Sequence, residues 1–159
     1  MTRIRFSGCV LSLGDEAPRW AKATIALEGE KVPQLVDLKE PRPLNRFERT
    51  LLDFVLDGPN GSPELRAQGA SAVVVSACDC GCKSVGLEPA QDTPDADAGN
   101  GAYGLTADGT SSTGVDVEVT LDVIFGRLTE LEIWDGALLD GESRGELPDV
   151  ETLVHREPS

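Results

Sequence analysis

The sequence predicts an α+β fold: a mostly antiparallel sheet packed by one long and one short helix, with a long flexible loop at 89–114. Several short segments alternate apolar and polar residues, which is typical of half-buried strands. One segment instead repeats its apolar residues at helical spacing. The chain has 159 residues, of which 40% are apolar, so we expect residues 1–159 to form a single domain with one core.

The first forty residues predict strands. Residues 3–13 (RIRFSGCVLSL) and 20–28 (WAKATIALE) alternate apolar and polar side chains. Residues 32–38 (VPQLVDL) predict a third strand. Because Pro33 has no N–H to donate to a neighbour, we expect this strand at a sheet edge.

Residues 44–57 predict the long helix, because apolar side chains recur every three or four positions and charged ones lie opposite. A short second helix should begin with Ser62 as N-cap and Pro63 at the first helical position, and end at Gly69. The apolar run at 70–77 (ASAVVVSA) then predicts a buried strand, with 83–88 (KSVGLE) as its hairpin partner.

Residues 89–114 change in composition toward Gly, Asp, Ser and Thr, with few apolar anchors. They predict the long mobile loop, with at most a short strand around Tyr103. Residues 115–136 (VDVEVTLDVIFGRLTELEIWDG) are the clearest hairpin of the chain. Residues 148–154 predict a short helix or strand.

The hairpin register follows from its alternation. A three-residue connection at 125–127 places Leu121 opposite Leu131 and Val119 opposite Ile133, so that apolar residues face each other. The other face then carries the candidate partner-binding residues Asp116, Glu118, Asp122, Glu130, Glu132 and Trp134. In this register Asp122 lies opposite Glu130, an unfavourable pairing of like charges.

Charge is distributed unevenly along the chain. Residues 1–66 hold ten basic and ten acidic side chains, whereas residues 67–159 hold four basic and eighteen acidic ones. No basic footprint for nucleic acid exists, and an anionic membrane would repel the chain. The leading hypothesis is therefore a non-enzymatic module that binds a basic protein through the acidic hairpin face, as an inhibitor-type or immunity-type protein would.

The stretch CDCGC, residues 78–82, allows three interpretations. Cys78, Cys80 and Cys82 could bind a metal such as zinc, with Cys9 or His155 as a fourth ligand. They could be redox-sensing thiols, although residues two apart in a strand lie near the limit for a disulfide. The third interpretation, favoured by Gly81, is a tight turn at a strand end with half-buried thiols.

Other chemistry is poorly supported. No nucleophile and base can be nominated, since the only histidine, His155, lies in a polar tail, so we expect a protein that is not an enzyme. Residues 95–101 do not match a calcium loop. No stretch is long and apolar enough for a membrane span, and no signal cleavage pattern is present, so we expect a cytoplasmic protein with reduced thiols. An exposed sheet edge could allow a homodimer.

The segments CDCGCKSVGLE, VTLDVIFGRLTELEIWDG and ELPDVETL together resemble a family of small uncharacterised bacterial proteins. Its members combine a Cys-Gly-Cys strand end with a C-terminal Gly-x-Leu-x-x-Leu-Glu hairpin. Proline commonly follows the Cys-Gly-Cys in that pattern, whereas this chain has Lys83. The resemblance covers about residues 43–153, including the helical segments PLNRFERTLLDFVL and ELRAQ, and implies an α+β domain without assigning an activity.

Overall fold

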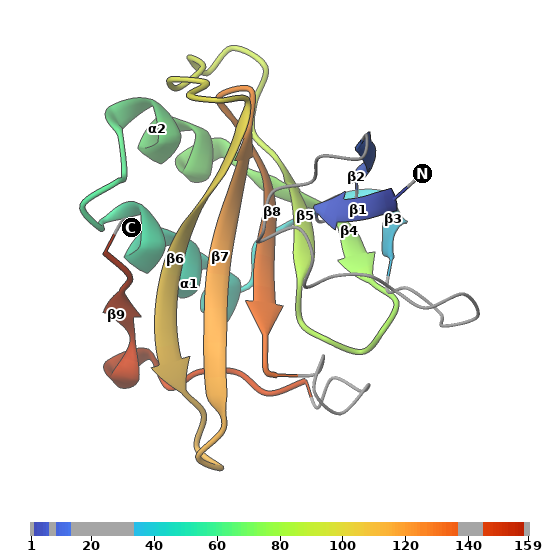
Figure 1. Cartoon of the computed structure of the whole chain (residues 1–159). Coiled ribbons are helices and arrows are strands. Elements are labelled where there is room, and N and C mark those ends of the chain that lie inside the picture. Colours follow the sequence, from blue (N-terminus) through green and yellow to red (C-terminus); the bar gives the residue numbers. More distant parts are fainter. Residues whose placement is uncertain (1, 7–8, 14–33, 137–144, 158–159) are drawn as a thin grey trace.

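The computed structural model is an α+β fold with a seven-stranded antiparallel sheet and two helices (Figure 1). It describes residues 2–6, 9–13, 34–136 and 145–157. The strands are β1 (Thr2–Phe6), β2 (Cys9–Leu13), β3 (Leu35–Pro43), β4 (Val73–Cys78), β5 (Val85–Glu88), β6 (Ala102–Thr110), β7 (Asp116–Ile124), β8 (Arg127–Trp134) and β9 (Val154–His155). The helices are α1 (Arg46–Leu56) and α2 (Pro63–Ser71), and a short 3-10 helix spans Val150–Thr152.

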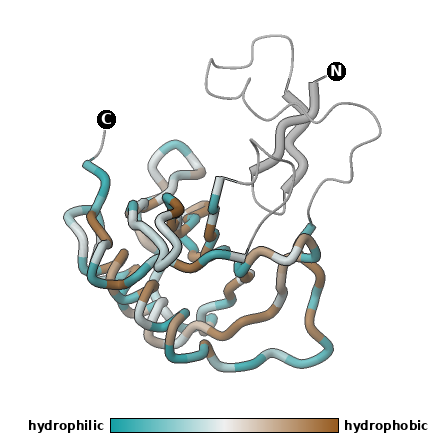
Figure 2. Tube along the Cα trace, turned by 90° about the horizontal axis from the view of Figure 1, so that it is seen from below, coloured by the Kyte–Doolittle hydropathy of each residue, from teal (hydrophilic) through white to brown (hydrophobic). Residues whose placement is uncertain are grey.

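The large sheet has the strand order β3-β4-β5-β8-β7-β6-β9, and both helices pack on one of its faces (Figure 1). Apolar side chains of the strands meet those of the helices in a single cluster. Its largest fully buried members are Leu51, Leu52, Leu65, Leu121, Leu128, Leu131, Val74, Val117, Val119 and Val123. Hydrophobic and hydrophilic residues alternate along the described part of the chain (Figure 2), as the sequence predicts.

The predicted long helix is confirmed as α1, and a capping box defines its start. The Asn45 side chain accepts from the Glu48 N–H, and the Glu48 carboxylate accepts from the Asn45 N–H, each at 2.8 Å. Arg42 of β3 also donates to both Glu48 oxygens at 2.8 Å. The first turn of α1 is therefore fixed to the edge strand as well as capped.

The second helix begins as predicted, with Ser62 as N-cap and Pro63 in the first turn, but it continues past Gly69 to Ser71. Gly69 is a packing position rather than a stop. A Cβ there would lie 2.5 Å from a methyl carbon of Leu56, and the Arg49 guanidinium donates to the Gly69 carbonyl at 2.6 Å. Glycine lets α1 and α2 approach closely, so the contact outweighs its poor helix propensity.

The strand prediction for the first forty residues is partly wrong within the described residues. In place of one strand over residues 3–13, Thr2–Phe6 and Cys9–Leu13 form two antiparallel strands, β1 and β2, in a separate two-stranded sheet. The strand predicted at 20–28 lies outside the described residues. The predicted edge strand is confirmed as β3, which extends to Pro43 and contains both Pro41 and Pro43. Edge strands tolerate proline because one side of the strand has no partner.

The prediction of a long loop at 89–114 is wrong for residues 102–110, where the short strand allowed around Tyr103 is a strand of nine residues. They form β6, which pairs with β7 over its full nine residues. Two glycines lowered the strand signal, but crowding requires them. A Cβ at Gly104 would lie 2.7 Å from Thr120, and one at Gly109 would lie 3.0 Å from Leu153. Pairing with β7 and burial of Leu105 and Ala107 outweigh the low local propensity.

The predicted hairpin register is confirmed, although its connection is not. Leu121 pairs with Leu131, Val119 with Ile133 and Asp122 with Glu130. The turn, however, has two residues, Phe125 and Gly126, both with positive φ. A β-bulge at Thr129 supplies the odd residue that the prediction had placed in the turn.

The two outer strands of the large sheet are β3 and the two-residue β9. β3 has mostly exposed side chains, among them Lys39 and Glu40, beside the two prolines. Charge and proline at an edge oppose pairing with another chain. The predicted homodimer through a sheet edge thus gains no support from β3, and it stays a prediction. None of the described helices has the length and apolarity needed to cross a membrane.

Candidate metal centre

Cys78 is the last residue of β4, and Cys80 and Cys82 lie in the turn that joins β4 to β5, as the strand-end interpretation predicted. The Cys78 N–H donates to the Ser84 carbonyl at 3.2 Å, which closes the turn. Asp79 and Gln34 exchange two hydrogen bonds of 2.8 and 2.9 Å, which tie the turn to the residue before β3. Gly81 has φ +89°, a conformation that favours glycine. The turn is thus held at both ends and sharply bent in the middle.

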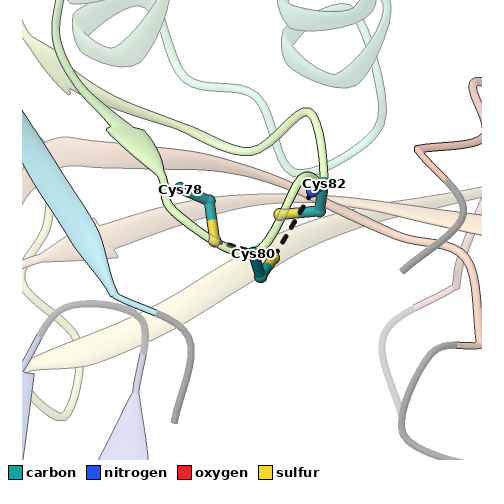
Figure 3. Close-up of side chains that lie close together, drawn as sticks. All are labelled: Cys78, Cys80 and Cys82. Atoms are coloured by element: carbon teal, nitrogen blue, oxygen red, sulfur yellow. Dashed lines mark hydrogen bonds between the residues drawn. The ribbon is translucent and has the colours of Figure 1, made fainter. Parts of the chain in front are cut away.

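This bend brings the thiols together. The Sγ atoms of Cys78, Cys80 and Cys82 all lie within 4.8 Å of one another (Figure 3). Cys78 Sγ and Cys80 Sγ are 2.9 Å apart, and the Cys82 N–H donates to Cys80 Sγ at 3.4 Å. All three are free, half-buried cysteines. At Zn–S bonds of about 2.3 Å, thiolates around one ion lie about 4 Å apart, so small movements would complete a site.

The three thiols differ in acidity. Burial raises the pKa of Cys78, and the hydrogen bond that its S–H donates to Cys80 raises it further. Burial also opposes ionisation of Cys80, but hydrogen bonds from Cys78 and from the Cys82 N–H outweigh burial and lower its pKa. For Cys82, burial raises the pKa in spite of a hydrogen bond with Ser84. Cys80 therefore ionises more readily than its two neighbours. A metal ion that binds all three would displace the protons of Cys78 and Cys82.

One predicted fourth ligand is excluded by position. His155 lies on β9, four strands from β5, which at the usual strand spacing is about 20 Å away. Its ring stacks on Phe54, with centroids 4.3 Å apart. Cys9, the other predicted ligand, belongs to β2, and its side chain lies outside what the structure describes. Within the described residues, the group that could hold a metal contains only the three cysteines.

A pocket of about 260 Å³ adjoins the cysteine turn on the side of the helices. Cys82, Lys83 and Ser84 of the turn line it together with Arg42, Asn45, Phe47, Glu48, Ala77, Val85, Ile133 and Leu147. Ser84 connects the turn to the core, because the Ile133 N–H donates to its Oγ at 2.9 Å. The pocket combines apolar walls with several polar groups, which is typical of small-molecule sites.

The charges of this pocket are only partly balanced. The carboxylate of Glu48, which lines the pocket, accepts two hydrogen bonds from Arg42. Burial opposes ionisation of Glu48, but the bonds from Arg42 and from the Asn45 N–H lower its pKa. Lys83 is exposed and forms no salt bridge with any residue in the described parts of the chain. The remaining charge of the pocket is therefore positive.

The six residues predicted to bind a partner lie together on the sheet face opposite the helices. In the β7–β8 ladder, Glu118 pairs with Trp134, Thr120 with Glu132 and Asp122 with Glu130. Asp116 is exposed at the start of β7. This face is less open than predicted, however. Glu118 forms an ion pair of 2.6 Å with Arg156, which also pairs with Asp108.

Glu130, one of the six predicted partner-binding residues, is buried, since only 5% of the residue is exposed. It lies opposite Gly86 of β5 as well as Asp122 of β7, in the middle of seven strands. Asp122, Glu130 and Glu132 each have interaction partners. The acidic face is thus partly used by the fold itself.

Comparison of the chain with protein-family models, curated proteins and solved structures gives no match. The resemblance to a bacterial family therefore stays an expectation. Sequence analysis had identified the thiols, but it missed the pocket and the roles of Arg42 and Ser84. The one available signal was Lys83, the charged residue beside the third cysteine where a proline was expected.

Proposed function

We propose that this protein binds a thiophilic metal ion of the zinc type through Cys78, Cys80 and Cys82. The observation that carries the proposal is the convergence of three free thiols within 4.8 Å in one anchored turn. Thiolates bind zinc and monovalent copper in preference to magnesium or calcium. The proposal includes a cytoplasmic, reducing location, because the ligands must be thiols.

The site is suited to reversible binding. Structural zinc sites usually have four protein ligands and supply folding energy outright. Here the described cluster offers three, and a continuous core of helix and strand residues is packed without it. The protein should therefore fold without metal and exchange the ion with its surroundings, as a metal carrier or sensor does.

The test is a zinc titration of reduced, metal-free protein against a chromophoric chelator. We expect one equivalent of zinc per chain, and at least about tenfold weaker binding in Cys80→Ser, because a ligand is lost. Lys39→Gln, which replaces an exposed lysine of β3, is the matched control and should bind zinc like the wild type. Less than one equivalent in the wild type, or equal affinity when all three cysteines are serine, would refute the proposal.

A purely redox role of the same thiols is the alternative within this class, favoured by the 2.9 Å between Cys78 Sγ and Cys80 Sγ. Peroxide would oxidise one thiolate to a sulfenic acid, which the second thiol would convert to a disulfide with release of water. Intact mass measured before and after peroxide treatment decides between the two. Loss of two hydrogens at low peroxide, reversible by reductant and unaffected by added zinc, would favour the redox role.

The acidic hairpin face remains a second candidate, for binding a basic protein in the manner of an inhibitor or immunity-type protein. It is favoured by Asp116, Glu118, Asp122 and Glu132 sharing one face with Trp134. It is weaker because Arg156 already neutralises part of the face. A basic partner retained by wild type and by the control Glu151→Gln, but released by Asp116→Asn with Glu132→Gln, would support it; equal retention by all three would refute it.

A further inference from the structure

The cysteine cluster leaves part of a metal's coordination shell to be filled. Three thiolates satisfy three positions of a tetrahedral zinc ion, and the described residues offer no fourth. Another thiolate is the ligand that such an ion prefers. A ligand from outside the chain would reach the ion through an opening beside the turn.

The pocket lined by Cys82 is such an opening. Cys82 belongs to both the thiol cluster and the pocket wall. At about 260 Å³ the pocket is smaller than the roughly 300–1,000 Å³ of sites for drug-sized ligands. Its occupant is therefore a small molecule, and Phe47, Val85 and Ile133 offer apolar contact for a short carbon chain.

The charge of the pocket specifies a second feature of the occupant. Arg42 is engaged by Glu48, whereas Lys83 forms no salt bridge with the described residues. Lys83 directly follows Cys82, and both residues line the same pocket, so one small molecule could contact both. In a chain of net charge −14, a lysine that has no salt bridge with the described residues and lines a pocket favours a carboxylate there.

We infer that the fourth ligand of the bound metal is a low-molecular-weight thiol that carries a carboxylate, with its sulfur on the metal and its carboxylate at Lys83. This inference rests on the proposed metal binding and names the molecule with which the ion would enter or leave. The thiol loses its proton to solvent as the metal–sulfur bond forms, water leaves the metal, and no oxidation state changes. Thiols of this kind are the reductants of a reducing compartment.

The experiment uses Co²⁺ as a visible substitute for zinc, with excess protein so that little cobalt is free. Co²⁺ binding is measured first without added thiol. The cobalt protein is then titrated with 3-mercaptopropionate and, separately, with 2-mercaptoethanol, which has a hydroxyl in place of the carboxylate. The readout is the sulfur-to-cobalt charge-transfer absorption, which grows by about one third when a fourth thiolate joins three.

We expect 3-mercaptopropionate to half-saturate the cobalt protein at a concentration about fivefold lower than 2-mercaptoethanol does. This ratio corresponds to the free energy of one exposed ion pair. Lys83→Gln should abolish this preference, and the matched control Lys39→Gln, an exposed lysine of β3, should keep it. Cobalt binding without added thiol is measured for each variant first, so that the two thiols are compared within one variant at equal cobalt occupancy.

Each other outcome is informative. If cobalt binds but neither thiol adds, or both add equally well, the inference is wrong and the metal site stands. If the added thiol binds the cobalt only in the variant Cys9→Ser, then Cys9 is the fourth ligand in the wild type, and the inference is wrong. If cobalt does not bind in the first step, the proposed function itself fails and the inference fails with it.

Discussion

At the scale of single residues, the cysteine turn depends on the backbone of Gly81. A Cβ at this position would meet no atom within 4 Å, so its φ of +89° alone restricts substitution. Gly114, in the turn between β6 and β7, has φ +83° and equally open surroundings. Gly81 lies in the turn of the cysteines, whereas Gly114 lies in a turn without cysteines. The two positions are therefore a matched pair for substitution.

Gly81→Ala and Gly114→Ala should each lower the free energy of unfolding by about 1 kcal/mol, the cost of a left-handed backbone for alanine. Only Gly81→Ala should also weaken zinc binding, by about fivefold, because the turn relaxes and the metal must restore its bend. Urea unfolding and zinc titration of both variants measure this. Equal zinc affinity in the two variants would show that the bend does not position the thiols.

Glu48 provides a pH-dependent contribution to stability. Its carboxylate is ionised in the folded protein and bonded to Arg42 and to the Asn45 N–H. Because its pKa is lowered on folding, the stability it contributes is present above the unfolded pKa of about 4.3 and is lost as pH falls through the folded pKa.

Glu48→Gln should therefore lower the free energy of unfolding by about 1–2 kcal/mol near pH 7. The difference from wild type should shrink as pH falls below about 4, where the wild-type carboxyl also becomes neutral. Urea unfolding at a series of pH values tests this. A difference that stays constant with pH would mean that shape, and not charge, makes Glu48 important.

At the scale of elements, the β-bulge reconciles a two-residue turn with the register of β7 and β8. Thr129 is the extra residue: Val123 pairs with Leu128 before it and Asp122 with Glu130 after it. Without Thr129, Leu128 and Glu130 would be neighbours and would still alternate between the two faces. A deletion here removes the bulge without reversing the strand.

Deletion of Thr129 should thus give a folded protein, with a loss of about 1 kcal/mol in unfolding free energy from the altered twist. Deletion of Thr120 in the middle of β7 should prevent folding, because it turns Val117 and Val119 to the opposite face. Circular dichroism and urea unfolding distinguish the two. A native-like Thr120 deletion, or an unfolded Thr129 deletion, would contradict this account of the register.

At the scale of the whole molecule, charge repulsion opposes folding. Residues 67–159 contain eighteen acidic and only four basic side chains, and this segment supplies β5 to β8 in the middle of the sheet. Folding brings Asp122 opposite Glu130, where an extended chain would keep such charges apart.

Raising NaCl from about 10 mM to about 0.5 M should screen this repulsion and raise the melting temperature of the metal-free protein by about 2–4 °C. The effect should diminish near pH 4, where the carboxylates begin to be neutralised. Thermal unfolding at both salt concentrations and both pH values provides the measurement. A lower melting temperature in salt at neutral pH would show that ion pairs such as Arg156 with Glu118 outweigh the repulsion.

The sequence by itself determined the parts of this protein whose signals are local. The period of apolar residues defined α1 and the register of β7 and β8, because a side chain's face depends only on its position along the element. Ser62 marked the start of α2 for the same reason, since a cap bonds to a residue three positions away. The proximity of the three cysteines was equally local.

Only the tertiary structure decided the features that depend on distant segments. β6 forms because β7 supplies its hydrogen bonds, Gly69 stays in α2 because Leu56 needs the space, and Glu130 takes a central position in the sheet because β5 pairs with β8. The pocket beside Cys82 is likewise made by β3, α1 and β8 together. Pairing and packing free energies come from residues far apart in the chain, so no local pattern records them.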